Sequence, residues 1–358
     1  MNIVIFFLSL AIILLSCELF TNGVEWVGRR FRLSEGCVGS ILAAVGTALP
    51  ETLVPLIAIL FLPTGAGEDI GVGAILGAPF MLVTLALFMC GIALLVFRKR
   101  RESSVLHVDS SLVRRDLLFF LIAYGMAAAV AFVPGDITWV RLILGVTLIV
   151  LYSFYVWRTV RSGAACPTET KDLYCFRAVC RLKPKRGVAR DPLAGTFDRL
   201  RSDEPSTSLI LFQVVAALLG IVLGANLFVE QIREIAVELA IPPLILALII
   251  APVATELPEK FNSIMWIRSR KDTFAIGNIT GAMVFQSCIP VTIGLILTSW
   301  HIDLGEPEQI IQAASIGIAL FSGVLLFARS NGKDLTSLVL LSGGVFYLLF
   351  ILLVLGLV

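Results

Sequence analysis

The sequence predicts an all-α, polytopic membrane protein with ten transmembrane helices, arranged as two inverted five-helix repeats with the N- and C-termini outside. Three observations support this fold class. The chain is 58% hydrophobic and only 15% charged, with a mean hydropathy of +0.95, whereas an average soluble domain is about half apolar and a quarter charged. Its basic residues fall on one side of the apolar segments, and its two halves share a motif.

Ten apolar segments approach or exceed the roughly 20 residues that a helix needs to cross a bilayer. The strands of a membrane barrel would be shorter and would alternate polar with apolar residues, so we expect helices. The segments cover residues 2–22, 36–62, 70–97, 116–133, 138–157, 208–230, 242–267, 274–299, 309–327 and 335–357.

The basic residues set the expected orientation. Of the 28 Lys and Arg residues, 25 lie in the loops that follow the odd-numbered segments, and the exceptions are Arg141, Arg233 and Lys260. By the positive-inside rule those loops are cytoplasmic, which places both termini outside. The basic runs at 98–101 and 182–190 are therefore interpreted as topology signals, and no nucleic-acid partner is expected.

The chain divides into a first five-helix repeat at 1–157, a cytoplasmic loop at 158–207 and a second five-helix repeat at 208–358. At an offset of 208 residues, "GTALPE" (46–51) aligns with "ATELPE" (254–259). Because five spans per half is an odd number, equivalent helices must cross the bilayer in opposite directions. Many secondary transporters use such inverted repeats, with the substrate near the midplane at the repeat interface.

Each copy of this motif offers oxygen atoms on one arc. A proline inside a helix leaves the carbonyl four residues earlier without its hydrogen bond, so we expect Pro50 to free the carbonyl of Gly46 and Pro258 to free that of Ala254. The i, i+4 spacing adds a hydroxyl and a carboxylate on the same face. Six to eight such hard oxygens suit calcium. The side chains concerned are Thr47, Glu51, Thr255 and Glu259.

A second correspondence, at an offset of 204 residues, aligns "GAILGAPFML" (73–82) with "GNITGAMVFQ" (277–286). The paired glycines allow close helix packing in the small-xxx-small manner. Packing alone is one explanation of this pattern, and a contribution to the site is the other.

These motifs resemble those of the sodium/calcium exchanger family, within the cation/calcium antiporter superfamily. The resemblance covers nearly the whole chain except 158–207, and this chain is a divergent member because its second motif is degraded. It implies that Glu51 and Glu259 are the central calcium and sodium ligands, with Thr47 and Thr255 beside them. In the second repeat, Asn278 is kept and Gln286 takes the last polar position. At other family positions the chain has residues that cannot ligate, namely Ala48, Ala78, Leu82 and Ala282.

Glu256 replaces the family's serine and is a further candidate ligand. Three carboxylates would then share one site, which makes Glu256 a candidate proton carrier. Alternatively, Glu256 pairs with Lys260 at a favourable i, i+4 spacing. A third reading makes Lys260 a tethered cation that replaces one sodium ion.

The leading hypothesis is a secondary antiporter that exchanges calcium, or a related cation, for sodium or protons by alternating access. The alternative is a transport-inactive relative that binds a cation for structural or sensory purposes. The pattern does not favour an enzyme, because the only histidines, His107 and His301, are predicted in loops. We expect no cofactor, a monomeric transport unit in the bilayer, and the plasma or inner membrane as its location.

Overall fold

The computed structural model describes most of the chain. The described residues are 3–30, 49–62, 65–101, 105–133, 137–161, 173–175, 205–331 and 335–357. Most of the loop predicted at 158–207 lies outside them, as does the segment 31–48.

The described chain is almost entirely helical, as its composition predicts. The helices, in chain order, are α1 (Ile3–Arg30), α4 (Leu49–Phe61), α5 (Ala66–Met81), the π-helix η2 (Leu82–Ala86), α6 (Leu87–Val96), α7 (Arg98–Arg101), α8 (Ser110–Ala131), α9 (Thr138–Arg161), α12 (Thr207–Leu239), α13 (Pro243–Thr255), α14 (Leu257–Arg268), α15 (Asp272–Leu297), α16 (Pro307–Arg329) and α17 (Ser337–Leu357). Two short strands, β1 (Val105–Leu106) and β2 (Leu335–Thr336), pair antiparallel.

Within the described residues, seven helices are long and apolar enough to cross a membrane: Val4–Gly23, Ala66–Val96, Thr138–Thr159, Thr207–Leu239, Asp272–Leu297, Pro307–Arg329 and Ser337–Leu357. The other three predicted segments correspond to α8, to α4, and to α13 with α14. The multi-pass helical class is thus established, while the count of ten spans and the inverted repeat stay predictions.

The structure corrects the expectation that the proline of the second motif lies inside one continuous helix. In the second half, α13 ends at Thr255, and Glu256 breaks the helix with φ −86° and ψ 8° before α14 begins at Leu257. The residues before α4, the helix that contains Pro50, lie outside the described part of the chain, whereas Pro258 is in the first turn of α14. A proline is tolerated there because first-turn N–H groups have no intrahelical partner.

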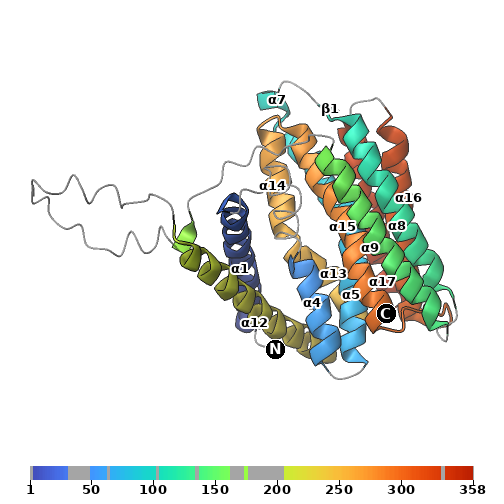
Figure 1. The fold of residues 1–358 in the computed structure, drawn as a ribbon. Coiled ribbons are helices and arrows are strands. Elements are labelled where there is room, and N and C mark those ends of the chain that lie inside the picture. Colours follow the sequence, from blue (N-terminus) through green and yellow to red (C-terminus); the bar gives the residue numbers. More distant parts are fainter. Residues whose placement is uncertain are drawn as a thin grey trace, which may run out of the picture.

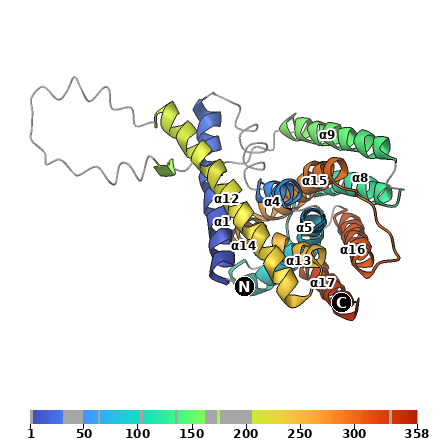
Figure 2. The same ribbon diagram turned by 90° about the horizontal axis from the view of Figure 1, so that it is seen from below.

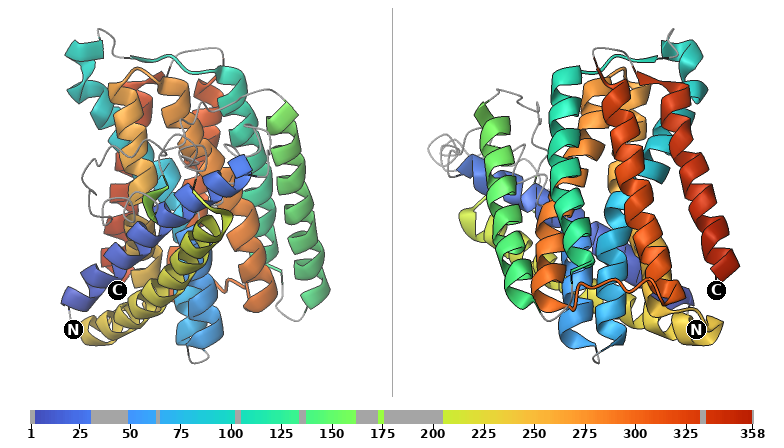
Figure 3. Two further views of the ribbon diagram at one scale, coloured as in Figure 1. Left: turned by 60° about the vertical axis from the view of Figure 1, so that its left-hand side comes forward. Right: turned by 90° about the vertical axis from the view of Figure 1, so that its right-hand side faces the viewer.

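Two helices form the centre of the bundle. Viewed along the helices in Figure 2, α5 lies among α4, α13, α15 and α16. The spans that contain α5 and α15 are the most buried, at 67% and 72% of their most apolar windows. The paired helices α1 and α12 cross on one side of this bundle, and α1 begins at the same end at which α17 finishes (Figures 1 and 3).

A buried ion pair joins the two halves at the opposite end. Arg101, at the end of α7, contacts Asp272 at the start of α15 through two hydrogen bonds of 2.7 and 2.6 Å and donates a third to the carbonyl of Ile267. Asp272 also accepts from the backbone N–H of His107 at 2.9 Å. Arg101 is only 4% exposed, so this member of the basic run at 98–101 is a structural tether as well as a basic residue at a helix end.

Candidate cation site

The two glutamates of the repeated motif are both buried and both lie at helix N-termini. Glu51 is in the first turn of α4 and Glu259 in the first turn of α14, and their exposed fractions are 4% and 3%. The electrostatic neighbours of Glu51 are Glu259 and Glu256. The structure therefore brings the acidic groups of the two halves together, and Glu259 lies at the start of α14, where the macrodipole favours negative charge.

Glu256 and Lys260 form a buried ion pair in the second half. The Lys260 Nζ atom lies 3.2 Å from Glu256 Oε2, and the two residues are 2% and 0% exposed. The same Nζ atom donates a hydrogen bond to the carbonyl of Pro252 at 3.2 Å. The predicted pairing of Glu256 with Lys260 is therefore present, and Glu256 also interacts with Glu259.

Oxygen atoms of Glu51 are available for a ligand. Neither Oε1 nor Oε2 accepts a hydrogen bond of normal geometry from the described residues, although both atoms are buried. The Thr255 hydroxyl, which donates to the carbonyl of Ala251 at 3.0 Å, is beside this carboxylate. A buried carboxylate without donors is costly unless a cation or a proton satisfies it, so the arrangement fits a hard cation as substrate.

Helix α15 supplies two predicted polar residues with different surroundings. The Asn278 amide donates to the backbone carbonyl of Glu259 at 3.2 Å and to the Ser263 hydroxyl at 3.3 Å, so it fixes the start of α14 against α15. Gln286 is 1% exposed, lies within reach of Glu256, and has an Oε1 atom that accepts no hydrogen bond from the described residues. Asn278 thus positions Glu259, and Gln286 offers a free oxygen.

The glycines of the second motif do different things in the two halves. A Cβ atom at Gly73 would stand 2.3 Å from the Leu244 carbonyl oxygen, and one at Gly77 only 2.1 Å from that of Leu248. A Cβ atom at the equivalent Gly277 or Gly281 of α15 would have no neighbouring atom closer than 3.3 Å. Close packing therefore explains the glycines of α5, which presses against α13, but not those of α15.

Two predicted residues are not placed, and a third supplies only backbone. Gly46 and Thr47 lie outside the described residues, and Ala254 is in the last turn of α13, where carbonyls lack intrahelical partners. In the described part of the chain, no three His, Cys, Asp or Glu side chains form a ready metal centre.

The structure adds one residue that the sequence reasoning missed. Cys17 of α1 is 5% exposed and has Glu51 and Glu259 as its charged neighbours. At the offset of 208, Cys17 is the first residue of the stretch that aligns with Ala225–Glu259. This alignment indicates that the helix of Cys17 belongs to the repeat, but it does not indicate that Cys17 lies near the glutamates.

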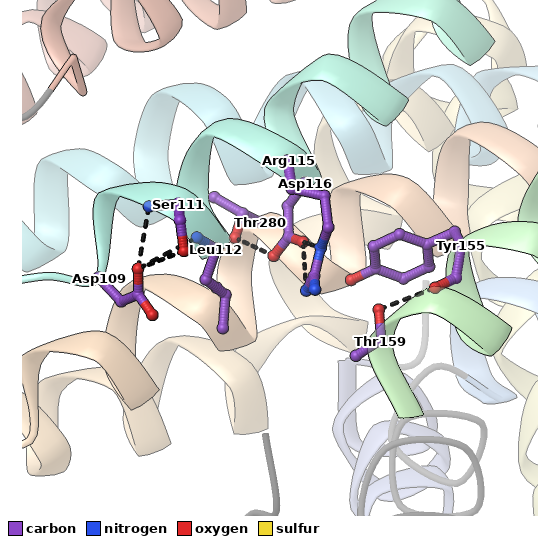
Figure 4. Close-up of polar contacts among 8 residues, drawn as sticks. All are labelled: Asp109, Ser111, Leu112, Arg115, Asp116, Tyr155, Thr159 and Thr280. Carbon is purple, nitrogen blue, oxygen red and sulfur yellow. Dashed lines mark hydrogen bonds and ion pairs between the residues drawn. The ribbon is translucent and has the colours of Figure 1, made fainter. Parts of the chain in front are cut away.

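A second polar cluster lies on α8, α9 and α15 (Figure 4). Asp116 is 1% exposed, accepts a hydrogen bond from the Thr280 hydroxyl at 2.9 Å and pairs with Arg115 at 3.2 Å. The Tyr155 ring lies beside them.

At the N-terminus of α8, Asp109 accepts hydrogen bonds from Ser111, and these hydrogen bonds lower the pKa of the Asp109 carboxyl below the usual 3.8.

Comparison with known proteins places the fold and the motifs in one family. A sequence model described as "Sodium/calcium exchanger protein" matches residues 1–161 and 209–358. The chain is 24% identical to the inner membrane protein YrbG of Escherichia coli over 339 residues, which is 94% of this chain and 92% of the relative. The chain therefore belongs to the sodium/calcium exchanger family.

Solved structures show the same fold. The chain resembles the crystal structure of an H⁺/Ca²⁺ exchanger, CAX, with a TM-score of 0.68, 16% identity, and coverage of 98% of this chain and 80% of the other. It resembles the sodium-calcium exchanger NCX_Mj, soaked with Na⁺ and Sr²⁺, with a TM-score of 0.57, 20% identity, and coverage of 98% and 97%. This is an integral, multi-pass membrane protein of a family of ion exchangers, and not of a family of enzymes in the usual sense.

Proposed function

We propose that this protein is a secondary antiporter that exchanges calcium, or a related divalent cation, for sodium or protons by alternating access. The observation that carries the proposal is the meeting of Glu51 and Glu259, two buried carboxylates from equivalent motif positions, at helix ends inside the bundle. A charge at the bilayer centre costs about 2.5–3.5 kcal/mol on insertion scales. Because two buried carboxylates at equivalent positions both carry this cost, the arrangement favours a function for Glu51 and Glu259.

The ligands of the proposed site come from both halves. Glu51 and Glu259 are the central ligands, and Thr255, Gln286 and Glu256 contribute further oxygens. Gly46, Thr47 and Ala254 complete the proposed set with backbone and hydroxyl oxygens, and Asn278 holds Glu259 in place through its backbone. Because one set of carboxylates binds either calcium or its competitor, and never both fully, binding of one ion displaces the other. That competition is the proposed source of coupling.

The membrane arrangement that we propose is ten spans in two inverted repeats, at 1–157 and 208–358, joined by a cytoplasmic loop at 158–207. It is supported by the equivalent central positions of α5 and α15 and by the pairing of α1 with α12 (Figures 1 and 2). We further propose a monomeric transport unit in the plasma or inner membrane. The description of YrbG as an inner membrane protein supports that location.

Calcium flux into proteoliposomes tests the function. The purified protein is reconstituted, and calcium uptake is followed under an outward sodium gradient, an outward potassium gradient or an outward proton gradient, each imposed alone. We expect uptake under the sodium or the proton gradient, and loss of at least about 100-fold of that flux in Glu51→Gln and in Glu259→Gln, since each removes a charged ligand. Glu230→Gln, on the exposed part of α12, is the matched control.

Two results would contradict the proposal. Retention of flux in both glutamine variants, with protein that elutes as a single folded species, would exclude these carboxylates as the exchange site. Calcium binding by the wild-type protein without exchange under any gradient would instead favour the transport-inactive relative. The apolar residues Leu82, Ala78 and Ala282 at ligand positions of the family are the observation that keeps this second function open.

A further inference from the structure

Lys260 is a buried lysine inside the proposed ion site. It is 2% exposed, it follows Glu259 directly in the chain, and its Nζ atom lies 3.2 Å from Glu256 Oε2. Glu256 in turn interacts with Glu259, and Glu51 interacts with both glutamates. The ammonium therefore belongs to the same electrostatic cluster as the three carboxylates.

The ligands of this ammonium are those that a small hard cation takes. Besides the Glu256 carboxylate, the Nζ atom contacts the carbonyl oxygen of Pro252 at 3.2 Å. That carbonyl is near the broken C-terminal end of α13 and also accepts from the Glu256 backbone N–H at 3.1 Å. A carboxylate and a backbone carbonyl at a helix C-terminus, where the macrodipole is negative, form an environment for a cation.

The first half has no such group. At the offset of 208 residues, Glu256 corresponds to Ala48 and Lys260 to Thr52, and neither residue is charged. At these two positions the second half carries one negative and one positive group, and the first half carries neither. The three carboxylates and one ammonium give a formal charge of −2, which is the charge of Glu51 and Glu259 alone.

We infer that the Lys260 ammonium is a built-in monovalent cation of the exchange site, held by Glu256 and Pro252, and that it sets how many free monovalent cations compete with one calcium ion. This inference rests on the proposed function. It predicts that the wild-type site, at −2, exchanges one calcium ion against two monovalent cations. Removing Lys260 leaves a site charge of −3, so a third monovalent cation is needed to balance it. Neutralising Glu256 leaves a site charge of −1, so only one monovalent cation is needed.

Equilibrium calcium binding to the full-length protein in detergent measures this number. Calcium affinity is determined by isothermal titration calorimetry at a series of sodium concentrations and at a series of pH values. The slopes of log Kd against log [Na⁺] and against the logarithm of the proton concentration together give the monovalent cations displaced per calcium ion. The wild-type protein should give a summed slope near two, Lys260→Met near three and Glu256→Gln near one.

The double variant separates a built-in cation from a purely structural ion pair. The double variant Glu256→Gln/Lys260→Met returns the formal charge of the site to −2. Its summed slope should therefore return to the wild-type value, even if the variant is less stable than the wild-type protein. Lys260→Arg keeps the charge and should also keep the slope, as should Lys271→Met, which removes an exposed lysine. Glu256→Gln tests the inference in the opposite direction if Lys260→Met does not fold.

The outcomes distinguish this inference from the function beneath it. Equal slopes in the wild-type protein, Glu256→Gln and the double variant would overturn the built-in cation and leave calcium exchange standing. A double variant with the slope of Lys260→Met would also overturn it. Absence of calcium binding by the wild-type protein would overturn the proposed function and this inference together.

Discussion

The two halves of the chain carry the same motif but build different surroundings for it. In the first half, α5 is pressed against α13 through Gly73 and Gly77, so that this side of the site is close-packed backbone. In the second half, α15 is surrounded by polar contacts, with Thr280 bonded to Asp116 and Asn278 bonded to Glu259. The comparison teaches that the equivalent helices α5 and α15 are held differently, α5 by close packing of backbone and α15 by hydrogen bonds.

The largest expected effect concerns the contact that joins the halves. Arg101→Met leaves Asp272 buried without its guanidinium partner, and breaking a buried pair in this way costs about 3–5 kcal/mol. We expect the apparent melting temperature in detergent to fall sharply. The measurement is thermal unfolding followed by intrinsic fluorescence.

The exposed pair within α12 is the matched control for this prediction. Arg233 and Glu230 form an ion pair in which both side chains are 40% exposed, and such a pair contributes about 0–1 kcal/mol. Arg233→Met should therefore leave the melting temperature nearly unchanged. Equal shifts in the two variants would show that burial of Arg101 does not determine the contribution of its ion pair.

The next effect compares equivalent glycines. Gly77→Ala places a Cβ atom 2.1 Å from the Leu248 carbonyl oxygen, so α5 and α13 must separate, and overpacking of this kind costs about 1–3 kcal/mol. Gly281→Ala meets only the Tyr155 hydroxyl at 3.6 Å and removes a flexible residue from a helix, which is worth up to about 1 kcal/mol in its favour. Thermal unfolding should move in opposite directions for the two variants, and a comparable loss in both would refute the difference between the halves.

A smaller effect is expected from the hydrogen bond that joins Thr280 of the second half to Asp116 of the first. Thr280→Val removes the hydroxyl that donates to Asp116 but keeps the shape of the side chain, and loss of a hydrogen bond to a buried charged group costs about 1.5–3 kcal/mol, part of which Arg115 offsets. The same exchange at the exposed Thr147, whose hydroxyl donates to the carbonyl of Ile143 in its own helix at 2.8 Å, is the control. A melting temperature for Thr280→Val no lower than that for Thr147→Val would contradict this role.

The sequence was sufficient to predict the membrane class. It also indicated Glu51 and Glu259 as a pair, which are electrostatic neighbours in the structure, and their role as ligands stays a prediction. Hydropathy and the placement of basic residues can be read directly from the sequence. The repeated motif indicates that two segments far apart in the chain occupy equivalent positions. The helix break at Glu256 was not predicted because a proline is equally compatible with a kink inside a helix and with the first turn of a new one. Only the folded chain distinguishes those two cases.

Other features of the site depend on contacts between distant residues. The i, i+4 spacing of Glu256 and Lys260 is compatible both with an ion pair and with a carboxylate that faces the site, and the structure contains both contacts. Arg101 was interpreted only as a topology signal, because nothing in the run of basic residues indicates which of them reaches Asp272. Cys17 was missed because its approach to Glu51 depends on how α1 crosses the bundle.

The smallest expected effect is at the N-terminus of α8, where Asp109 of the first half caps the helix and its backbone N–H donates to Thr273 of the second half at 3.0 Å. Asp109→Ala should lower stability by about 1 kcal/mol at neutral pH, since an N-cap aspartate contributes roughly that amount. The hydrogen bonds from Ser111 lower the pKa of the Asp109 carboxyl below 3.8 in the folded protein. The carboxylate's contribution is therefore fully present above that value and is lost as the pH falls through the lowered pKa. The difference in melting temperature between wild type and Asp109→Ala should shrink from pH 7 to pH 3, whereas Asp109→Asn, which caps without titrating, should keep its difference from Asp109→Ala at both pH values. A difference between wild type and Asp109→Ala that is the same at pH 7 and pH 3 would show that the cap does not depend on the ionised carboxylate.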